Sequence, residues 1–280
     1  MSSSPGQDYS IGDPRSMEDI SDPNRPVLRP CELEGFDYQL DPYFGCGHQC
    51  QYCYALCGAG GSWVEEVRGY EHLAERLRAE VARLEPQTIY LGLYCDPYQP
   101  AERGRGDTGT AVRVLEKAGF SAHILTKSDL FLRDLEFLAN MPEASVSISL
   151  AFSDPALKQA LEPGTPSYPR RIRALKEAKA AGLKTSVLIC PVLPFLTDLR
   201  ALVGMVEGVA ERVWIYPLSM QSEIDPNWRQ VWQVIQEKRP KLSADFKAAV
   251  FDREHAYWRE QRELARELAE NSSAEFIIKL

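Results

Sequence analysis

Short apolar segments alternate with longer amphipathic segments along most of the chain. The short segments predict strands, and they are Phe36–Leu40, Thr88–Leu93, Ala122–Thr126, Ala144–Leu150, Thr185–Cys190 and Arg212–Tyr216. The longer segments have apolar residues at helical spacing and predict helices, namely Glu65–Leu84, Gly109–Ala118, Asp129–Asn140, Tyr168–Ala181 and Leu199–Ala210. Strand and helix follow each other in turn, which indicates an α/β protein with a parallel sheet covered by helices.

Two architectures agree with that order, an open doubly wound sheet and a partial barrel. Periodicity does not choose between them. In both, ligands bind at the carboxyl ends of the parallel strands. The segments that follow the predicted strands are therefore where we expect a site.

The two ends of the chain lie outside this repeat. Residues 1–30 are rich in Ser, Pro, Asp and Gly, which predicts a polar leader that is mobile or loosely docked. Residues 31–222 form the predicted α/β domain, and residues 223–280 are expected to cap it as a small extension. That extension should contain two helices and a last strand, at Trp228–Arg239, Arg253–Glu270 and Ala274–Leu280.

Charge and cysteine content narrow the function classes. The formal net charge is −8, so the chain as a whole lacks the electrostatic footprint of a protein that binds nucleic acid or anionic membranes. No run of about 18 apolar residues predicts a transmembrane helix, and the polar N-terminus does not resemble a secretion signal. Seven cysteines, three of them clustered, favour a reducing cytoplasm and a metal site over a disulfide framework.

The clustered cysteines lie in Gly45–Tyr54, directly after the first predicted strand. A loop this short can point three thiolates at one centre, one fewer than the four that usually hold a four-iron cluster. A cluster on Cys46, Cys50 and Cys53 would keep one iron without a protein ligand, open to a reactive molecule. Glycines on both sides of Cys46 let the backbone bend around the cluster.

A structural zinc site is the alternative interpretation of the same thiols. Its fourth ligand would be His48 or Cys57. Such sites usually show two separated ligand pairs, and the chain has no second Cys-x2-Cys or His pair. We interpret Cys57 as a spare thiol, because a fourth protein ligand would close the open iron of the cluster, and we expect His48 and His72 to bind no metal.

Polar residues recur after the later predicted strands, as a site at this edge requires. They are Cys95–Glu102, Thr126–Ser128, Ser147, Ser149, Glu162–Thr165, Arg170, Arg171 and Cys190.

The cysteine spacing, with an aromatic residue before the last cysteine, resembles the cluster motif of the radical S-adenosylmethionine (SAM) enzymes. The rim segments are similar to those of the relatives of spore photoproduct lyase. These relatives often carry Thr-Asp-Pro-Tyr-Gln-Pro-x-Glu, Thr-Lys-Ser and Arg-Asp, which match Asp96–Glu102, Thr126–Ser128 and Arg133–Asp134. Glu162–Thr165 and the following Arg171 resemble the lyase itself. The resemblance covers about residues 38–220 and implies a partial (β/α)6 barrel of the radical SAM type.

The resemblance also implies cofactors and a reaction. A [4Fe-4S] cluster on Cys46, Cys50 and Cys53 would bind SAM at its open iron. One electron, from a donor such as flavodoxin or ferredoxin, would cleave SAM to methionine and a 5′-deoxyadenosyl radical. That radical would abstract hydrogen from an unidentified substrate.

Roles for the rim residues follow from the resemblance and from their chemical type. SAM would contact Tyr52, Lys127, Ser147, Ser149, Glu162, Arg171 and Ile189. Substrate would contact Asp96 and Glu102, with Tyr98 and Cys95 as catalytic candidates and Cys95 as a hydrogen donor.

Several of these residues have simpler interpretations. Lys127 and Glu162 would then form an ordinary ion pair, and Ser147 would alternate outward on its strand. Ile189 and Cys95 would pack in the core. Arg170, Arg171 and Arg173 would form a solvated helix face, with Cys31 and Cys190 as structural residues.

The chain departs from its relatives in ways that affect the substrate. Cys95 stands where many carry Thr, and Asp107–Gly109 replaces a Leu-Thr-Arg step. The acidic charge disfavours DNA, so we expect a small-molecule or peptide substrate. The alternatives are a lyase that repairs DNA photolesions and, in another class, a zinc-stabilised binding module.

Overall fold

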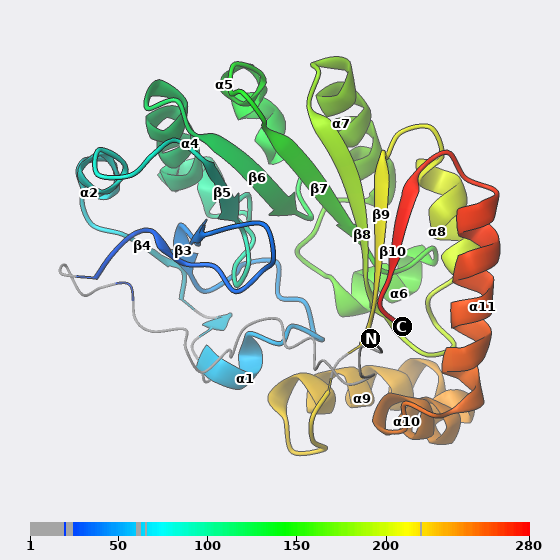
Figure 1. Ribbon diagram of the computed structural model, residues 1–280. Coiled ribbons are helices and arrows are strands. Elements are labelled where there is room, and N and C mark those ends of the chain that lie inside the picture. Colours follow the sequence, from blue (N-terminus) through cyan, green and yellow to red (C-terminus); the bar gives the residue numbers. More distant parts are fainter. Residues whose placement is uncertain (1–19, 21–24, 60–62, 65, 219) are drawn as a thin grey trace, which may run out of the picture.

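The computed structural model describes residue 20 and residues 25–59, 63–64, 66–218 and 220–280. Its main feature is a curved, largely parallel sheet with helices packed on its outer side (Figure 1). In spatial order the strands are β1 (Arg29–Pro30), β2 (Tyr38–Leu40), β5 (Thr88–Leu91), β6 (Ser121–Thr126), β7 (Ser145–Leu150), β8 (Lys184–Val192), β9 (Arg212–Pro217) and β10 (Glu275–Ile278). Only β1 pairs antiparallel within this sheet, and no pairing in the described part of the chain joins β1 to β10. The predicted partial barrel of six strand–helix units is confirmed.

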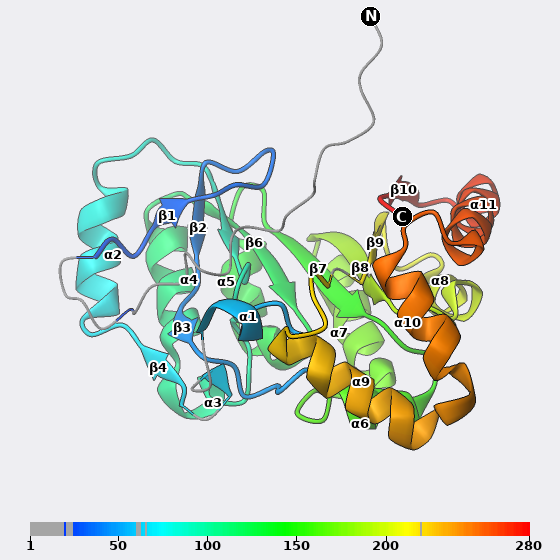
Figure 2. The ribbon, with the colours of Figure 1, turned by 90° about the horizontal axis from the view of Figure 1, so that it is seen from below.

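Six of the described helices form a layer on the outer side of the sheet. The outer layer contains α2 (Leu73–Val81), α4 (Asp107–Lys117), α5 (Leu135–Ala139), α7 (Tyr168–Ala180), α8 (Leu199–Val206) and α11 (Ala256–Glu270). The other helical elements are α1 (Leu56–Ala59), α3 (Glu102–Arg105), η3 (Leu130–Asp134), α6 (Pro155–Leu161), α9 (Pro226–Lys238), η4 (Pro240–Leu242) and α10 (Ser243–Phe251). Helix α1 contacts α9, and the two lie together in Figure 2.

The two faces of the sheet differ in exposure and polarity. Residues of β6, β7 and β8 that face the helices are fully buried and mostly aliphatic: Ala122, Ile124, Val146, Ile148, Val187 and Ile189. The residues that alternate with them on the opposite face are more polar and partly more exposed: His123, Leu125, Ser145, Ser147, Ser186 and Leu188. Adjacent strands pair in register, as His123 does with Ser145, so each row crosses several strands. The core lies between sheet and helices, and the concave face remains for ligands.

The six strands predicted for the α/β domain are present as β2, β5, β6, β7, β8 and β9, and their ends differ from the predicted ones by one or two residues. Strand β8 continues through Pro191 to Val192, whereas the sequence predicted an end at Cys190. Pairing with β9 shifts register between Ile189 and Val192. The amide that Pro191 lacks therefore falls at an irregular place in the ladder, where proline is tolerated.

The predicted helix at Glu65–Leu84 was wrong in its first half. Helix α2 begins only at Leu73, because Arg68–Gly69 forms the strand β4 and pairs antiparallel with β3 (Tyr43–Phe44). His72, just before the helix, has a positive φ of 53°. The predicted helix at Asp129–Asn140 is split into the 3-10 helix η3 and the α-helix α5, each of five residues.

The chain ends only partly follow the predictions. Most of the predicted leader, residues 1–19 and 21–24, lies outside the described residues. The last part of that leader is firmly docked, because Val27 and Leu28 are buried and their amides donate to the Glu80 carboxylate at 2.8 Å. The extension contains three α-helices instead of two among the residues described after 222, followed by β10. No helix in the described ranges is both long and apolar enough to cross a membrane.

Candidate functional site

The three clustered cysteines lie between β3 and α1, with their side chains half-buried. The backbone enters the loop at Gly45 with a φ of +88°, and a Cβ there would collide with the Glu66 carbonyl. The Cys46 amide donates to the Trp63 carbonyl at 2.9 Å. Glycine at position 45 is therefore required by both the backbone angle and the close approach.

The cysteine loop is docked on the segment that follows α6. His48 Nδ1 lies 3.0 Å from the Gly164 carbonyl, and the Gly164 amide donates to the His48 carbonyl at 3.1 Å. The Gln51 amide donates to the Leu161 carbonyl at 2.9 Å. A Cβ at Gly164 would lie 2.5 Å from the Gly47 carbonyl oxygen, so the two segments can meet only at a glycine.

Burial makes these thiols poor acids without a metal. It raises the pKa of Cys46 to about 12, with the nearby Asp96 carboxylate adding to the shift. It raises the pKa of Cys50 well above its usual value against the opposing effect of Lys127, and it raises the pKa of Cys53 as well. Three thiolates therefore require a strongly cationic centre in this loop.

Lys127 brings a positive charge to the loop from the end of β6. Its ammonium lies 5.8 Å from the centre of the Tyr52 ring. Burial opposes the charged form, but the Glu162 carboxylate and Cys50, in its thiolate form, outweigh it and raise the pKa of Lys127. Among the described residues we find no hydrogen bond or ion pair to its Nζ, so this cation can receive an anionic ligand.

Glu162 and Arg171 form a fully buried ion pair at 2.5 Å, beside the same ring. Glu162 also accepts a hydrogen bond from the Tyr52 hydroxyl. Arg171 donates to the Ser149 carbonyl at 2.8 Å. The alternative interpretation of Arg171 as part of a solvated helix face is therefore wrong, and Glu162 pairs with Arg171 instead of Lys127. This pair holds Tyr52 and the end of β7 in place.

The remaining residues predicted to bind SAM lie on two faces of the sheet. The Ser147 hydroxyl is engaged on the concave face, 2.6 Å from Ser186 Oγ and 3.2 Å from His123 Nε2. Ser149 lies one step nearer the strand end and donates to the Cys190 carbonyl at 3.3 Å. Ile189 is fully buried on the face covered by helices. Of the three, Ser149 is placed best for a ligand at the rim.

Two residues predicted to act on substrate have another role in the structure. Glu102 is completely buried and accepts from the Thr108 and Gly109 amides, at 2.9 and 3.0 Å, at the start of α4. Tyr98 is 1% exposed, and its hydroxyl donates to Asp134 at 3.2 Å. Neither side chain has free surface for a substrate, so both stabilise the segment that follows β5.

Asp96, the other predicted substrate contact, joins three rim segments. Its carboxylate accepts from the Thr126 hydroxyl at 2.6 Å and the Lys127 amide at 2.7 Å, and it lies 3.2 Å from His48 Nε2. Burial works against the carboxylate form, but His48 and these donors lower the pKa of Asp96 to about 2. Asp96 therefore positions Lys127 next to the cysteine loop.

The structure tests the donors proposed for a zinc site. His48 is engaged with Gly164 and Asp96, and the Cys57 thiol donates to Asn227 Oδ1 at 3.3 Å on α9. Within the described ranges no three His, Cys, Asp or Glu side chains are arranged to hold one metal ion. A four-iron cluster makes a different demand, because each thiolate binds a separate iron. The loop therefore suits a cluster better than a zinc ion.

A model of the radical SAM superfamily matches residues 40–202, more than half of the chain. The chain belongs to the radical SAM superfamily. The match includes the cysteine loop and every rim residue discussed above. Membership implies an iron–sulfur cluster and SAM, and the donor set found here is compatible with both.

Similar sequences come from bacteria and archaea. An uncharacterized protein of Mycobacterium tuberculosis is 33% identical over 214 residues, which is 70% of this chain and 63% of that protein. An uncharacterized protein of Methanocaldococcus jannaschii is 27% identical over 224 residues, covering 75% of this chain and 84% of that protein. The chain thus spans less than two thirds of the length of its mycobacterial relative.

Similar solved structures share the radical SAM fold. A variant of spore photoproduct lyase has a TM-score of 0.65 and 16% identity, covering 91% of this chain and 80% of the lyase. SuiB of Streptococcus suis, bound to SAM, has a TM-score of 0.56 and 14% identity, covering 86% of this chain and 50% of SuiB. At such identities the likeness establishes architecture only.

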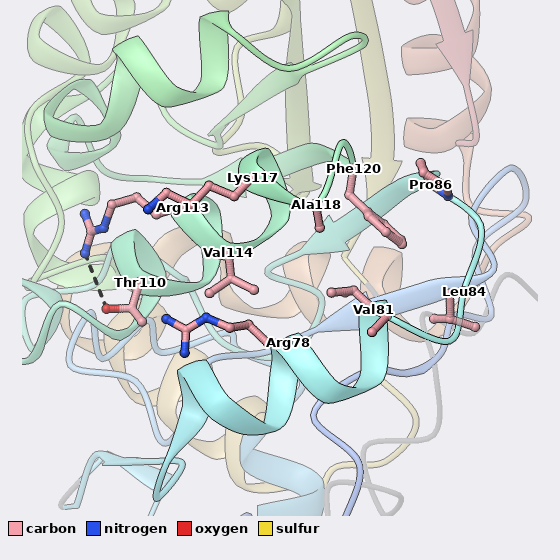
Figure 3. Close-up of a pocket in the computed structure, with 11 residues that line it drawn as sticks. Arg78, Val81, Leu84, Pro86, Thr110, Arg113, Val114, Lys117, Ala118 and Phe120 are labelled. Carbon is pink, nitrogen blue, oxygen red and sulfur yellow. Dashed lines mark hydrogen bonds between the residues drawn. The ribbon is translucent and has the colours of Figure 1, made fainter.

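A pocket of about 580 Å³ lies away from this rim, between α2 and α4 (Figure 3). Its floor contains Val81, Val114 and Phe120, and its edge carries Arg78 and Lys117. None of the site residues predicted from the radical SAM resemblance lines it, so the pocket belongs to the outer helix layer.

Two of the residues that shape the loop, His48 and Gly164, were not predicted from the sequence to do so. The sequence suggests His48 only as the fourth ligand of the alternative zinc site, and Gly164 only as part of a motif. The signal for the first was a histidine inside the cysteine loop. The signal for the second was a Pro-Gly step just after a helical segment.

Proposed function

We propose that this radical SAM protein holds a [4Fe-4S] cluster on Cys46, Cys50 and Cys53 and uses it to cleave SAM to a 5′-deoxyadenosyl radical, which abstracts hydrogen from a substrate. The observation that carries the proposal is the group of three half-buried thiols beside the Lys127 ammonium, at the carboxyl edge of the sheet. The cluster and SAM supply the radical chemistry. The chain supplies binding, orientation and exclusion of water.

Lys127 is the residue that we propose for the SAM carboxylate. Its charge is maintained by the negative potential around it, and Asp96 fixes its backbone amide. A compact ammonium suits an anionic head group. We expect Lys127→Met to weaken SAM binding roughly tenfold or more, as for a lost hydrogen bond between charged groups, with the cluster retained.

Tyr52 is proposed as a wall of the same site. Its ring lies beneath Lys127, and its hydroxyl is held by Glu162, so the ring cannot turn away. Ser149 is proposed to bond the ribose or the amino acid part of SAM. Glu162 and Arg171 are bonded to each other, so a contact of either residue with SAM would be additional to this ion pair. The contact of Ile189 with the adenine remains a prediction.

The substrate is proposed to be a small molecule or a peptide. One structural neighbour is spore photoproduct lyase complexed with a dinucleoside spore photoproduct, and another is SuiB bound to the precursor peptide SuiA. The net charge of −8 favours a substrate without a long polyanionic backbone. An electron donor such as flavodoxin or ferredoxin completes the proposal.

The role of Cys95 as a hydrogen donor remains a prediction. It requires that a buried thiol reach the substrate. Its side chain is 2% exposed, and its amide donates to the buried Asp41 at 3.1 Å. Burial, with Asp41 and Cys46 nearby, raises the pKa of the Cys95 thiol. If the thiol reaches the substrate radical, Cys95→Ala will spare SAM cleavage and divert the product. A structural role will instead lower the melting temperature without changing the product.

The deciding experiment is anaerobic reconstitution with iron and sulfide, followed by dithionite and SAM. We expect about four irons per chain and the formation of 5′-deoxyadenosine and methionine. Cys50→Ala should abolish both results, whereas Cys31→Ala, which removes a thiol outside the cysteine loop, should leave them unchanged. A colourless protein with one zinc, or a fully loaded protein that cannot cleave SAM, would refute the proposal.

A further inference from the structure

The side chain of Gln99 is completely buried against the cysteine loop. Its Oε1 accepts from the Gly47 amide at 2.7 Å, and its Nε2 donates to the Gly45 carbonyl at 2.8 Å. These two groups flank Cys46 on either side. The Gln99 side chain is therefore hydrogen-bonded to the backbone on both sides of Cys46, the first of the clustered cysteines.

This contact reproduces the bonding of a parallel β-bridge. In such a bridge, one residue donates to the carbonyl before its partner and accepts from the amide after it. Here a side-chain amide takes the place of a backbone strand. Of the natural side chains, only Asn and Gln offer a carbonyl oxygen and an amide donor side by side, and Asn is one methylene shorter. Glutamine is thus the side chain that satisfies both groups from this distance.

Other contacts leave Cys46 little freedom on its opposite side. Its own amide is bonded to the Trp63 carbonyl, and Gly45 is pressed against the Glu66 carbonyl. Gln99 also belongs to the turn that begins with Asp96, because its backbone amide donates to the Asp96 carbonyl at 3.3 Å. Asp96 in turn holds the Lys127 amide. One turn therefore fixes both Cys46 and Lys127.

We propose that Gln99 is a positioning residue that holds Cys46 in place for the cluster, in register with Lys127. The inference rests on the proposed function, because it assigns Cys46 to the cluster. Gln99 touches neither substrate nor reacting atoms; it acts through the backbone on both sides of Cys46. Without it, the half-buried Gly47 amide and the buried Gly45 carbonyl would lose their partners.

The test compares Gln99→Met, which keeps the length of the side chain but removes both hydrogen bonds, with the wild-type chain. In the cluster-free protein, hydrogen exchange at the Gly47 amide should be roughly tenfold faster in the variant, as for the loss of one buried hydrogen bond. In the reconstituted protein, iron should be lost to a chelator faster, and the electron paramagnetic resonance spectrum of the reduced cluster should change. Gln159→Ala, at an exposed position of α6, is the matched control and should match wild type in all three measurements.

Gln99→Glu keeps the experiment decisive if the methionine variant does not fold. Its carboxylate can still accept from the Gly47 amide but cannot donate to the Gly45 carbonyl. We expect protection at Gly47 with an altered cluster spectrum. The inference would be overturned if the variant that folds equals wild type in all three measurements: hydrogen exchange at the Gly47 amide, retention of iron and the spectrum of the reduced cluster. A wild-type chain that binds no iron would instead overturn the proposed function, since the exchange measurement does not depend on the cluster.

Discussion

The buried pair of Glu162 and Arg171 has a structural role that the sequence did not predict. Both residues hold Tyr52 and the end of β7 in place, and their contact with SAM stays a prediction. Breaking one partner of such a pair leaves an uncompensated buried charge, which is costly. The arginine therefore matters first for stability.

We expect Arg171→Met to lower the free energy of unfolding by about 3–5 kcal/mol, measured by urea denaturation. The control is Arg173→Met on the same helix, where the arginine is 65% exposed and lies 3.4 Å from Glu177. Such surface pairs contribute about 0–1 kcal/mol. Equal losses in the two variants would show that the buried pair has no special role.

His123 should make stability depend on pH. It lies on the concave face, 2.8 Å from Ser145 Oγ, and burial, together with Arg212, lowers the pKa of its imidazole to about 4. An unfolded chain protonates this group near pH 6.5. Between these values the unfolded state binds more protons, so the stability contributed by neutral His123 is lost as the pH falls from 6.5 toward 4.

The measurement is the free energy of unfolding of cluster-free protein between pH 7.5 and pH 5, in steps of about half a unit. His123→Gln should flatten this dependence, and His72→Gln should not, because His72 is 74% exposed. Identical slopes for wild type and His123→Gln would contradict the assignment.

From the sequence we could predict the three clustered cysteines as a site, but not the residues that hold their loop in place. Cys46, Cys50 and Cys53 are recognisable because their spacing is local. The contacts of Gln99 and His48 with this region were not predicted, because their partners lie 52 and 116 residues away along the chain. A contact of that separation leaves no periodic trace in the sequence.

At the scale of elements, the parallel strands of the large sheet were easier to predict than the two-residue strands β1, β3 and β4, none of which was predicted. The strands buried on one face gave clear apolar segments, and all six were found. Helix α6 was missed, although Asp154 accepts from the Ala156 amide at 2.8 Å and Pro155 opens the helix. An Asp-Pro step followed by apolar residues is a recognisable helix start. The false first half of α2 arose because β4 pairs with a strand distant in sequence.

The contact between the cysteine loop and the segment after α6 can be tested by a substitution that adds one methyl group at Gly164. In Gly164→Ala, the new Cβ would lie 2.5 Å from the Gly47 carbonyl oxygen and 2.8 Å from that of His48. Backbone atoms cannot yield without moving the loop. We expect a melting temperature several degrees lower and reduced iron content after reconstitution.

Gly104→Ala in α3 is the matched control, because no atom lies within 4 Å of a Cβ at that position. Alanine is also the better helix former there. The control should therefore keep wild-type stability and iron content. Full iron loading of Gly164→Ala would show that the two segments separate without consequence for the cysteine loop.

The whole molecule is best understood as one unit that includes residues 223–280. Strand β10 extends the sheet by pairing with β9, and α11 packs on α8. The predicted extension therefore supplies an edge strand and part of the helix layer. Its large buried side chains include Trp228, Phe246 and Trp258.

A chain ending at residue 222 should consequently fail to fold by itself. It would expose β9 along its length and uncover α8, whose Leu202, Val203 and Val206 are now buried. Losing a buried Leu or Phe typically costs about 2–5 kcal/mol, and total stability is only about 5–15 kcal/mol. We expect no cooperative thermal transition by circular dichroism, whereas Arg200→Ala, which removes only the exposed contact with Glu267, should unfold like the wild type. A truncated chain that melts cooperatively near the wild-type temperature would instead show that the barrel is a domain in its own right and the extension a separate cap.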